Sequence, residues 1–230
     1  MSNEKNTPIL PSSTSTLDGL SQLIATSHAN ETDNSLVPKL TTEHKIPPLE
    51  KWQPKFCGDM DLTIKANGEW WHEGQKVTRQ SLVDLFASVL WAETDEQGDT
   101  TYFLKTPVEK LKIQVEDAPL LVTQVDSIEK NGKTYLEFTT PHGDKVIADN
   151  EHPITLEQPN SATDDSTTPQ PYILVRQNGD SKLYGLIHRN VFYHLLNMGE
   201  LSQISVDTGE QTCLTLKSGD CVFSLSVPNN

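Results

Sequence analysis

The chain contains an internal repeat. Three blocks of residues recur further along the chain at a nearly constant separation of 110 or 111 residues. The aligned blocks are 64–74 with 175–185, 77–86 with 187–196, and 102–115 with 212–225. Because three separate blocks keep the same order and spacing, we interpret them as a duplicated unit. Two copies that face each other would form a cleft, and clefts are where small molecules bind.

Composition divides the chain into a tail and a folded part. Only 35% of the 230 residues are hydrophobic, which is low for a fully packed chain. Residues 1–45 are rich in Ser, Thr, Asn and Pro, and we expect them to be a disordered N-terminal tail. We place the first repeat unit at 46–117 and the second at 118–230, with a polar loop insertion at 157–171.

The charge of the chain excludes several partners. The formal net charge is −14 and the pI is about 4.8. A nucleic-acid polymer or an anionic membrane would be repelled, because both need a surface rich in Lys and Arg. A small anion held by two or three local arginines remains possible, since the local field governs a pocket.

The cysteines and the hydropathy pattern favour a cytoplasmic protein. Cys57, Cys213 and Cys221 are odd in number and include no CxxC pair, so neither a disulfide framework nor a zinc site is expected. The histidines lack metal-ligand spacing, and we expect no metal and no cofactor. No run of about 18 apolar residues could span a bilayer.

Local patterns predict a small α+β module in each unit. Asn67-Gly68 and Asn178-Gly179 each predict a hairpin turn between two strands. Apolar residues at helical spacing predict a helix over 78–93 with Thr78 as N-cap, and a second helix near 188–198. Alternating segments between these elements predict antiparallel strands. We therefore expect two similar units, each an antiparallel sheet packed with one helix.

Three arginines are candidate ligands for an anion. Arg79 and Arg189 occupy equivalent places at the start of the two helices, where an anion would gain from both the guanidinium and the helix N-terminus. The alternative is a structural pair between each arginine and a carboxylate of the sheet. Arg176, with Lys65 as its counterpart, is by default a solvated strand residue, although an arginine suits bidentate anion recognition.

Polar residues cluster in two turns of the first unit. Thr106, Glu109 and Lys110 place a hydroxyl, a carboxylate and an ammonium in one tight turn. Glu116 and Asp117 are adjacent carboxylates, but neighbours on a strand point to opposite faces and do not form a catalytic pair by themselves. We expect them to cap a turn or to pair with the arginines rather than to catalyse a reaction.

These segments resemble a proteobacterial family known as domain of unknown function 1285. The resemblance covers about residues 46–200 and rests on PPLEKWQPKFCGDMDLTIKANGEWWHEGQKVTRQSLVDLFASVL, YFLKTPVEKLKIQVEDAPL, TTPHGD and YILVRQNGDSKLYGLIHRNVFYHL. It implies a duplicated α+β core whose C-terminal unit resembles a pleckstrin-homology barrel. It also implies a ligand site at the domain interface, suited to a nucleotide-like ligand with a role in signalling, and no enzymatic activity.

The family patterns map onto specific positions of this chain. They correspond to Trp70, Arg79, Thr106 to Lys110, Glu116 to Pro119, Arg176, and Arg189 with Tyr193. Two positions depart from the family pattern. Leu120 replaces an aromatic residue, and Asn178-Gly179-Asp180 replaces a more usual Leu-Glu-Ala.

The leading hypothesis is a non-enzymatic protein that binds a small anionic, nucleotide-derived ligand between its units. Its candidate ligand-binding residues supply cations, aromatic surfaces, and carboxylates or hydroxyls that accept hydrogen bonds. They are Trp70, Arg79, Thr106, Glu109, Lys110, Glu116, Asp117, Asp144, Arg176, Arg189 and Tyr193. The alternatives are a protein-interaction module that recruits a partner through its acidic surface and tail, and a hydrolase-like enzyme using Glu116 and Asp117.

Overall fold

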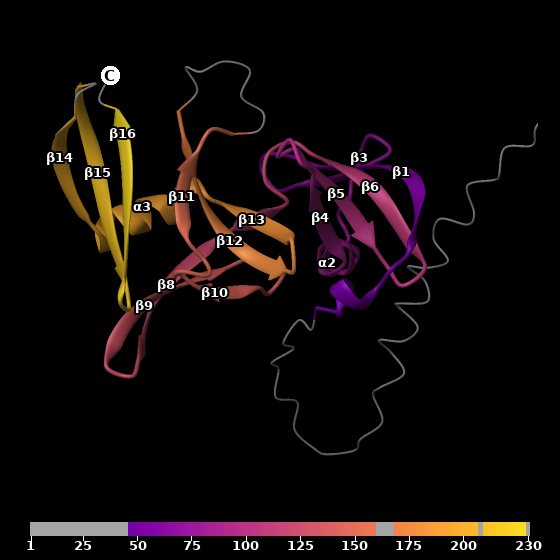
Figure 1. The fold of residues 1–230 in the computed structure, drawn as a ribbon, viewed down its shortest axis with the longest axis horizontal. Coiled ribbons are helices and arrows are strands. Elements are labelled where there is room, and N and C mark those ends of the chain that lie inside the picture. Colours follow the sequence, from indigo (N-terminus) through magenta and orange to yellow (C-terminus); the bar gives the residue numbers. More distant parts are fainter. Residues whose placement is uncertain (1–45, 160–167, 207–208, 229–230) are drawn as a thin grey trace, which may run out of the picture.

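The computed structural model describes residues 46–159, 168–206 and 209–228. The predicted tail and residues 160–167 of the predicted insertion lie outside the described residues. Figure 1 shows the first unit at one end of the molecule and the strands β14 to β16 at the other. Within the described residues, no helix has the length and apolar character needed to cross a membrane.

The first unit is a six-stranded sheet packed with one helix. The strands are hydrogen-bonded in the order β3-β2-β1-β6-β5-β4, with β1 and β6 parallel and the other neighbours antiparallel. Its elements are η1 (Leu49–Lys51), β1 (Lys55–Ile64), β2 (Trp70–His72), β3 (Gln75–Lys76), α2 (Gln80–Ser88), β4 (Leu90–Thr94), β5 (Thr100–Lys105) and β6 (Glu109–Val115). Helix α2 buries Val83, Phe86 and Ala87 in the core.

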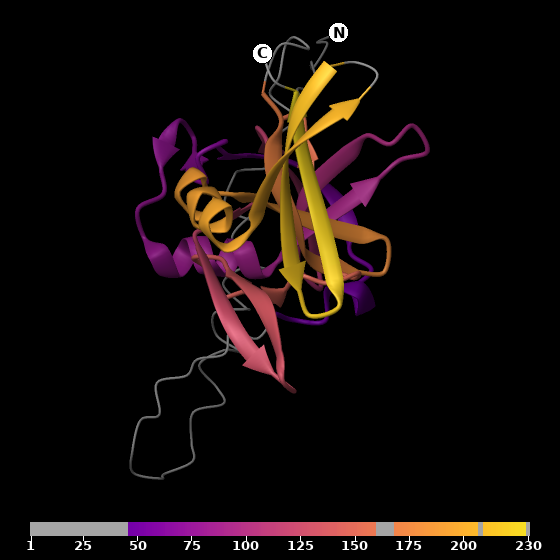
Figure 2. The same cartoon turned by 90° about the vertical axis from the view of Figure 1, so that its left-hand side faces the viewer.

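The second unit divides its strands among three small sheets, ordered β10-β9-β8, β11-β12-β13-β7 and β14-β15-β16. Its elements are β7 (Leu120–Val122), β8 (Gln124–Lys130), β9 (Lys133–Thr139), β10 (Lys145–Ile147), β11 (Ile154–Glu157), β12 (Gln170–Asn178), β13 (Ser181–Ile187), α3 (Arg189–Met198), β14 (Glu200–Val206), β15 (Gly209–Ser218) and β16 (Cys221–Pro228). In Figure 2 the β8–β9 hairpin extends downward, and its end contacts the β15–β16 turn, where the backbone N–H of Gly219 donates to the carbonyl oxygen of Thr134 at 2.8 Å.

The order of elements repeats between the units. A hairpin, a helix and three strands (β1, β2, α2, β4, β5, β6) are followed later by a hairpin, a helix and three strands (β12, β13, α3, β14, β15, β16). The sheets nevertheless differ. In the first unit β6 pairs with β1, whereas in the second unit the edge of β12 is paired with β11. The strands β14 to β16 form a separate sheet.

Several boundaries differ from the sequence predictions. The helix predicted over 78–93 is too long, because α2 ends at Ser88 and Leu90–Thr94 pairs with β5 instead. The predicted N-cap Thr78 is also wrong, since Arg79 holds that position. Helical spacing cannot separate a helix from a following buried strand when both are apolar. The second helix is confirmed as α3, whereas β11 and β14 were not predicted.

The two predicted hairpins are present, with the second turn displaced by one residue. The first turn spans 65–69 and contains Gly68 with a φ of +83°. The second turn consists of Gly179 and Asp180, because Asn178 pairs with Ser181 within the ladder. A positive φ of +61° at Gly179 explains why a residue without a Cβ stands there.

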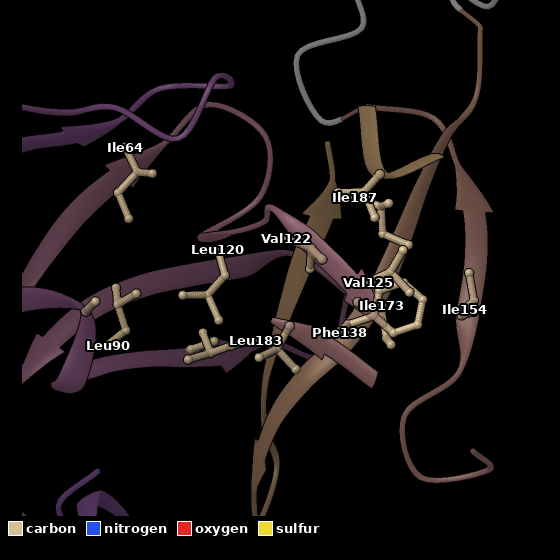
Figure 3. Packing of buried hydrophobic residues seen from close by; sticks show 14 of the residues in the cluster. Ile64, Leu90, Leu120, Val122, Val125, Phe138, Ile154, Ile173, Leu183 and Ile187 are labelled. Carbon is tan, nitrogen blue, oxygen red and sulfur yellow. The ribbon is translucent and has the colours of Figure 1, made fainter. Parts of the chain in front are cut away.

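The hydrophobic core is continuous across the boundary between the units. One cluster of buried residues joins Ile64 and Leu90 of the first unit to Leu120, Ile173 and Leu183 of the second. Figure 3 shows these side chains together, with Leu120 on β7 near the boundary. Leu120 is fully packed despite its departure from the family's aromatic residue. The two units therefore share a packed core along their boundary.

The fold class is α+β with two units, dominated by sheets. The expected pleckstrin-homology-like barrel is not confirmed, because the described strands of the second unit form three separate ladders without a closed barrel. In the sheet β11-β12-β13-β7, the outer strands are β11, which pairs with β12, and β7, which pairs with β13. The two outer strands are not paired with each other, so this sheet is not closed into a barrel.

Candidate functional site

Hydrogen bonds and close packing join the two units along their boundary. The backbone N–H of Ala92 on β4 donates to Ser181 Oγ on β13 at 3.0 Å. A Cβ built on Gly68 would lie 2.9 Å from the side chain of Leu121, so the first hairpin turn touches β7 directly. His142 Nδ1 lies 3.0 Å from Asp84 Oδ1 of α2. The boundary is thus held by polar links as well as by the core.

Arg176 is the strongest polar link between the units. Its Nε and Nη2 donate to Asp144 at 2.6 and 2.8 Å, and its Nη1 donates to the carbonyl oxygen of Ala87 at 2.6 Å. Both charged side chains are almost completely buried. A cation is favourable at this position because the last carbonyls of α2 carry partial negative charge. The expectation of a solvated Arg176 was wrong, because β12 is buried on both faces.

The two helix-entrance arginines each have a local partner. Arg79 is the N-cap of α2, and its Nε donates to Ser81 Oγ at 3.1 Å. Arg189 begins α3, and its Nε donates to the hydroxyl of Tyr193 at 2.9 Å. Tyr193 remains about half exposed. Both arginines lie at the starts of their helices as predicted, and each is exposed.

The polar turn of the first unit is organised by its own side chains. Thr106 is buried, and its Oγ1 accepts the backbone N–H of Glu109 at 3.0 Å. Lys110 Nζ donates to both carboxylate oxygens of Glu93 at 2.8 and 2.9 Å, and lies over the ring of Phe103. The structure therefore does not bring Arg79, Lys110, Arg176 and Arg189 to one set of partners.

Glu116 and Asp117 point to different environments, although both lie in the bend after β6 and not on a strand as expected. Glu116 accepts from Lys65 Nζ at 2.6 Å and from the backbone N–H of Ala66 at 3.1 Å, so it caps the first hairpin turn. These contacts lower the pKa of Glu116, the Lys65 hydrogen bond most of all. Asp117 is only 3% exposed and faces the boundary between the units.

Trp70 belongs to the core rather than to an open stacking surface. Its ring stacks on Phe86 and meets His142 edge to face. It also borders a cavity of about 210 Å³ at the boundary, together with His142, Pro119 and Leu121. Trp70 is only 2% exposed, so its ring is part of the core and borders this cavity from below the surface.

A second cavity at the boundary is lined by tyrosines that sequence reasoning did not single out. Its volume is about 60 Å³, and its walls come from both units. The lining residues are Tyr102, Asp117, Ala118, Pro119, Glu157, Gln158, Tyr172 and Tyr184. The hydroxyl of Tyr172 donates to Asp117 at 2.8 and 3.0 Å from its two carboxylate oxygens. Because Asp117 and Tyr172 are 55 positions apart in the sequence, no local sequence pattern predicts this contact.

Burial keeps the tyrosines of this cavity protonated. It raises the pKa of Tyr102 to about 12, with further contributions from the charge of Asp117 and from Tyr184. Burial also raises the pKa of Tyr172, as does the hydrogen bond to Asp117. The pKa of Tyr184 is raised by burial and by the charge of Glu157. The raised pKa values extend the pH range over which these hydroxyls stay neutral.

Two larger grooves adjoin this cavity. A groove of about 490 Å³ shares Tyr102 and Tyr184 with the cavity and adds Thr94, Asp180 and Lys182. Another, of about 580 Å³, shares Tyr184 and Lys182 and continues past His152. Tyr184 therefore borders all three spaces. Volumes of this size are typical of small-molecule sites, which span about 300–1,000 Å³.

The described residues contain no group of three or more His, Cys, Asp or Glu side chains arranged to hold a metal ion. The carboxylates of the tyrosine-lined cavity, Asp117 and Glu157, are accompanied there by tyrosines and a glutamine. What this arrangement can do chemically is accept hydrogen bonds and attract positive charge.

Comparison with known proteins identifies the family. Residues 47–118 match the N-terminal domain of the domain of unknown function DUF1285, and residues 119–225 match the C-terminal domain of the protein of unknown function DUF1285. The chain belongs to this family. It matches no curated protein.

Two solved structures are similar to this chain. A DUF1285 family protein from Silicibacter pomeroyi DSS-3 shares 33% sequence identity, with 87% of this chain and 92% of that chain covered and a TM-score of 0.62. A DUF1285 family protein from Shewanella baltica OS155 shares 27% identity, with 60% and 91% covered and a TM-score of 0.41. The first supports the two-unit fold.

Proposed function

We propose that this protein binds a small ligand at the interface of its two units, without catalysis, and that binding serves signal transduction. The observation that carries the proposal is the shared wall formed by Tyr102 of the first unit and Tyr184 of the second. A ligand in the adjoining groove would contact both units at once. Its binding energy would therefore depend on how the units are held together, which is what a signalling protein requires.

The proposal keeps the anionic, nucleotide-like ligand expected from the sequence. The cation that contacts it is not Arg176 but another residue. The guanidinium of Arg176 is already engaged by Asp144 and Ala87, so a phosphate would have to displace a buried pair. Lys182 is exposed and borders the groove beside Tyr184. A base could stack on a tyrosine while an anionic group lies near Lys182.

A thermal-shift screen with nucleotides and nucleotide-derived compounds tests this function. A ligand present at about 100 times its Kd stabilises the folded state by about 2.7 kcal/mol, and the melting temperature should rise accordingly. We expect Tyr184→Ala to abolish the shift. The matched control is Tyr193→Ala, which removes an exposed tyrosine of α3 and should leave the shift unchanged. A shift that survives Tyr184→Ala would place the ligand elsewhere.

A protein-interaction module is the second candidate, and one observation favours it. The strand β14 is an edge of its three-stranded sheet, and Leu201 and Ile204 on it are exposed. Open edges with apolar side chains invite pairing with another chain. If a partner binds here, Leu201→Lys should abolish its binding while leaving the response to small ligands unchanged. Pull-down with the purified variant measures this.

A further inference from the structure

The cavity beside Trp70, with a volume of about 210 Å³, is separate from the tyrosine-lined cavity and its grooves. The first unit contributes Trp70, Val77 and Val83 to its walls, and the second unit contributes Pro119 and Leu121. Of these residues only Pro119 also borders the tyrosine-lined cavity, and none borders the groove of about 490 Å³. This space, the Trp70 cavity, is therefore not used by the function proposed above.

The walls and the volume of the Trp70 cavity suit an aromatic ring. Trp70, Val83 and Pro119 are buried, and Val77 and Leu121 are partly buried. All five side chains are apolar, and water is held in a cavity only where polar groups bind it. An apolar cavity of about 150 Å³ holds a benzene molecule, and this one has a volume of about 210 Å³. The expected occupant therefore has one ring or two fused rings.

The charged side chains at this cavity do not select an ion. Lys76 and Glu69 both border it, and Lys76 Nζ donates to Glu69 Oε1 at 2.6 Å. The other carboxylate oxygen of Glu69 accepts from Trp71 Nε1 at 3.1 Å. The ammonium and the carboxylate offset each other, whereas an ion moved against the apolar walls would lose its hydration. A neutral molecule is therefore the better occupant.

His142 adds one directed polar group to the apolar walls. Its side chain is only 8% exposed, and its Nδ1 lies 3.0 Å from Asp84 Oδ1, which also accepts from Gln80 Nε2 at 2.8 Å. A carboxylate oxygen accepts, so Nδ1 carries the proton, and Nε2 of the neutral imidazole is an acceptor. Within the described residues no hydrogen bond joins Nε2 to another group, although His142 lines the cavity. An occupant with an N–H or O–H group would supply the missing donor.

We propose that the Trp70 cavity binds a neutral aromatic molecule of one or two rings that donates a hydrogen bond from a ring N–H or O–H to Nε2 of His142. The volume sets the size of the molecule, the offset charges favour a neutral one, and the acceptor on His142 requires a donor. Such a molecule would contact both units at once. The site is additional to the groove beside Tyr184, where the nucleotide-like ligand is proposed to bind.

Indole and benzofuran test this site, because the two molecules have nearly the same shape and only indole carries a ring N–H. Their binding to the full chain is measured at pH 8 by saturation-transfer NMR and by the melting temperature. We expect indole to bind saturably and benzofuran to bind at least tenfold more weakly, a factor that corresponds to about 1.4 kcal/mol. Equal affinity for the two molecules would overturn the hydrogen bond to His142.

Variants locate the ring and its hydrogen bond. Val77→Trp places an indole ring of the protein itself in the cavity, and we expect it to abolish indole binding. Val108→Trp is the matched control, because it adds the same ring at an exposed valine outside the cavity. His142→Phe keeps an aromatic ring but removes the acceptor, so it should lower the affinity for indole to that for benzofuran. His194→Phe, at an exposed histidine of α3, should leave both affinities unchanged.

Two further measurements apply if a variant does not fold. Leu121→Phe fills the same cavity from the second unit and takes the place of Val77→Trp. For His142, ¹⁵N NMR of the wild-type protein replaces the variant, and indole should shift the resonance of Nε2 more than that of Nδ1. An Nε2 resonance that does not respond to saturating indole would overturn the hydrogen bond.

The outcomes separate this site from the proposed function. No binding of indole, or indole binding unchanged in a folded filling variant, overturns the site. The thermal shift produced by nucleotides should be the same in the wild type and in Val77→Trp. If nucleotides fail to bind while indole binds, only the proposed function is wrong. If nucleotides bind in a Tyr184-dependent way while indole does not, only the Trp70 cavity proposal is wrong.

Discussion

Arg176 of β12 holds Asp144 through two charge-assisted hydrogen bonds of 2.6 and 2.8 Å, at a site where both side chains are buried. The same guanidinium donates to Ala87 at the end of α2 in the first unit. One side chain therefore connects β12 and the turn at Asp144, both in the second unit, to the end of α2 in the first unit. Its main role in the folded protein is to join the units.

Breaking this pair should destabilise the whole protein. Arg176→Ala leaves the carboxylate of Asp144 buried without its cation, and removal of one partner of a buried pair costs about 3–5 kcal/mol. We expect that loss in the free energy of unfolding measured with urea. Arg189→Ala removes an exposed arginine and should change it by less than about 0.5 kcal/mol. A loss below about 1 kcal/mol for Arg176→Ala would contradict this role.

The same pair should make stability depend on acid pH. Burial alone would raise the pKa of Asp144, but the hydrogen bond and charge of Arg176 lower it below the ordinary value. The contribution is therefore fully present above the pKa of an unfolded aspartate, about 3.9, and is lost as the pH falls through the lower folded value. Urea unfolding from pH 7 to pH 3 should show the stability difference between the wild type and Asp144→Asn shrinking below about pH 4. A constant difference would argue against the linkage.

Tyr102 should weaken the protein at alkaline pH. Its pKa is raised to about 12, chiefly by burial, so the folded state favours the protonated hydroxyl. That contribution is complete below the ordinary tyrosine pKa of about 10 and is lost as the pH rises through about 12. The difference in tyrosinate absorbance between the wild type and Tyr102→Phe should have its midpoint near pH 12. A midpoint near 10 would show that this hydroxyl is exposed to water.

Ser181 links β13 of the second unit to β4, the edge strand of the first unit. Its buried hydroxyl accepts the N–H of Ala92, and Ser181→Ala would leave that buried amide without its acceptor. Such a loss costs about 1–3 kcal/mol. The exposed Ser224 provides the control, because Ser224→Ala removes a hydroxyl that faces solvent. Equal stability of the two variants in urea would mean that water replaces the lost acceptor.

Alanine substitutions at two glycines distinguish the cost of backbone strain from the cost of close packing at the boundary between the units. Gly68 and Gly74 both have positive φ, +83° and +72°, but only the first has a neighbour close to its Cβ position, Leu121. An alanine at either position costs about 1–2 kcal/mol in backbone strain. We expect Gly68→Ala to cost about 1 kcal/mol more than Gly74→Ala, because overpacking adds to that strain. Equal melting temperatures would show that Leu121 moves aside freely.

Local features were predictable because each depends on a few neighbouring residues. Asn-Gly pairs indicated both hairpins, and apolar spacing indicated α3 (Arg189–Met198) within a residue or two. The expectation that Glu116 caps a turn was met at the first hairpin, where its carboxylate accepts from Ala66. The repeat indicated that a hairpin, a helix and strands follow one another in both units.

What the sequence by itself determined was therefore the two units, one helix in each and their hairpin turns, because these depend on short-range spacing. The tertiary structure decided the end of α2, the burial of Arg176 and the tyrosine-lined cavity. Each of these depends on a contact between residues far apart in the chain, such as Ala87 with Arg176 or Asp117 with Tyr172. No local pattern encodes which distant side chain will cover a strand, since burial arises only when the two units pack together.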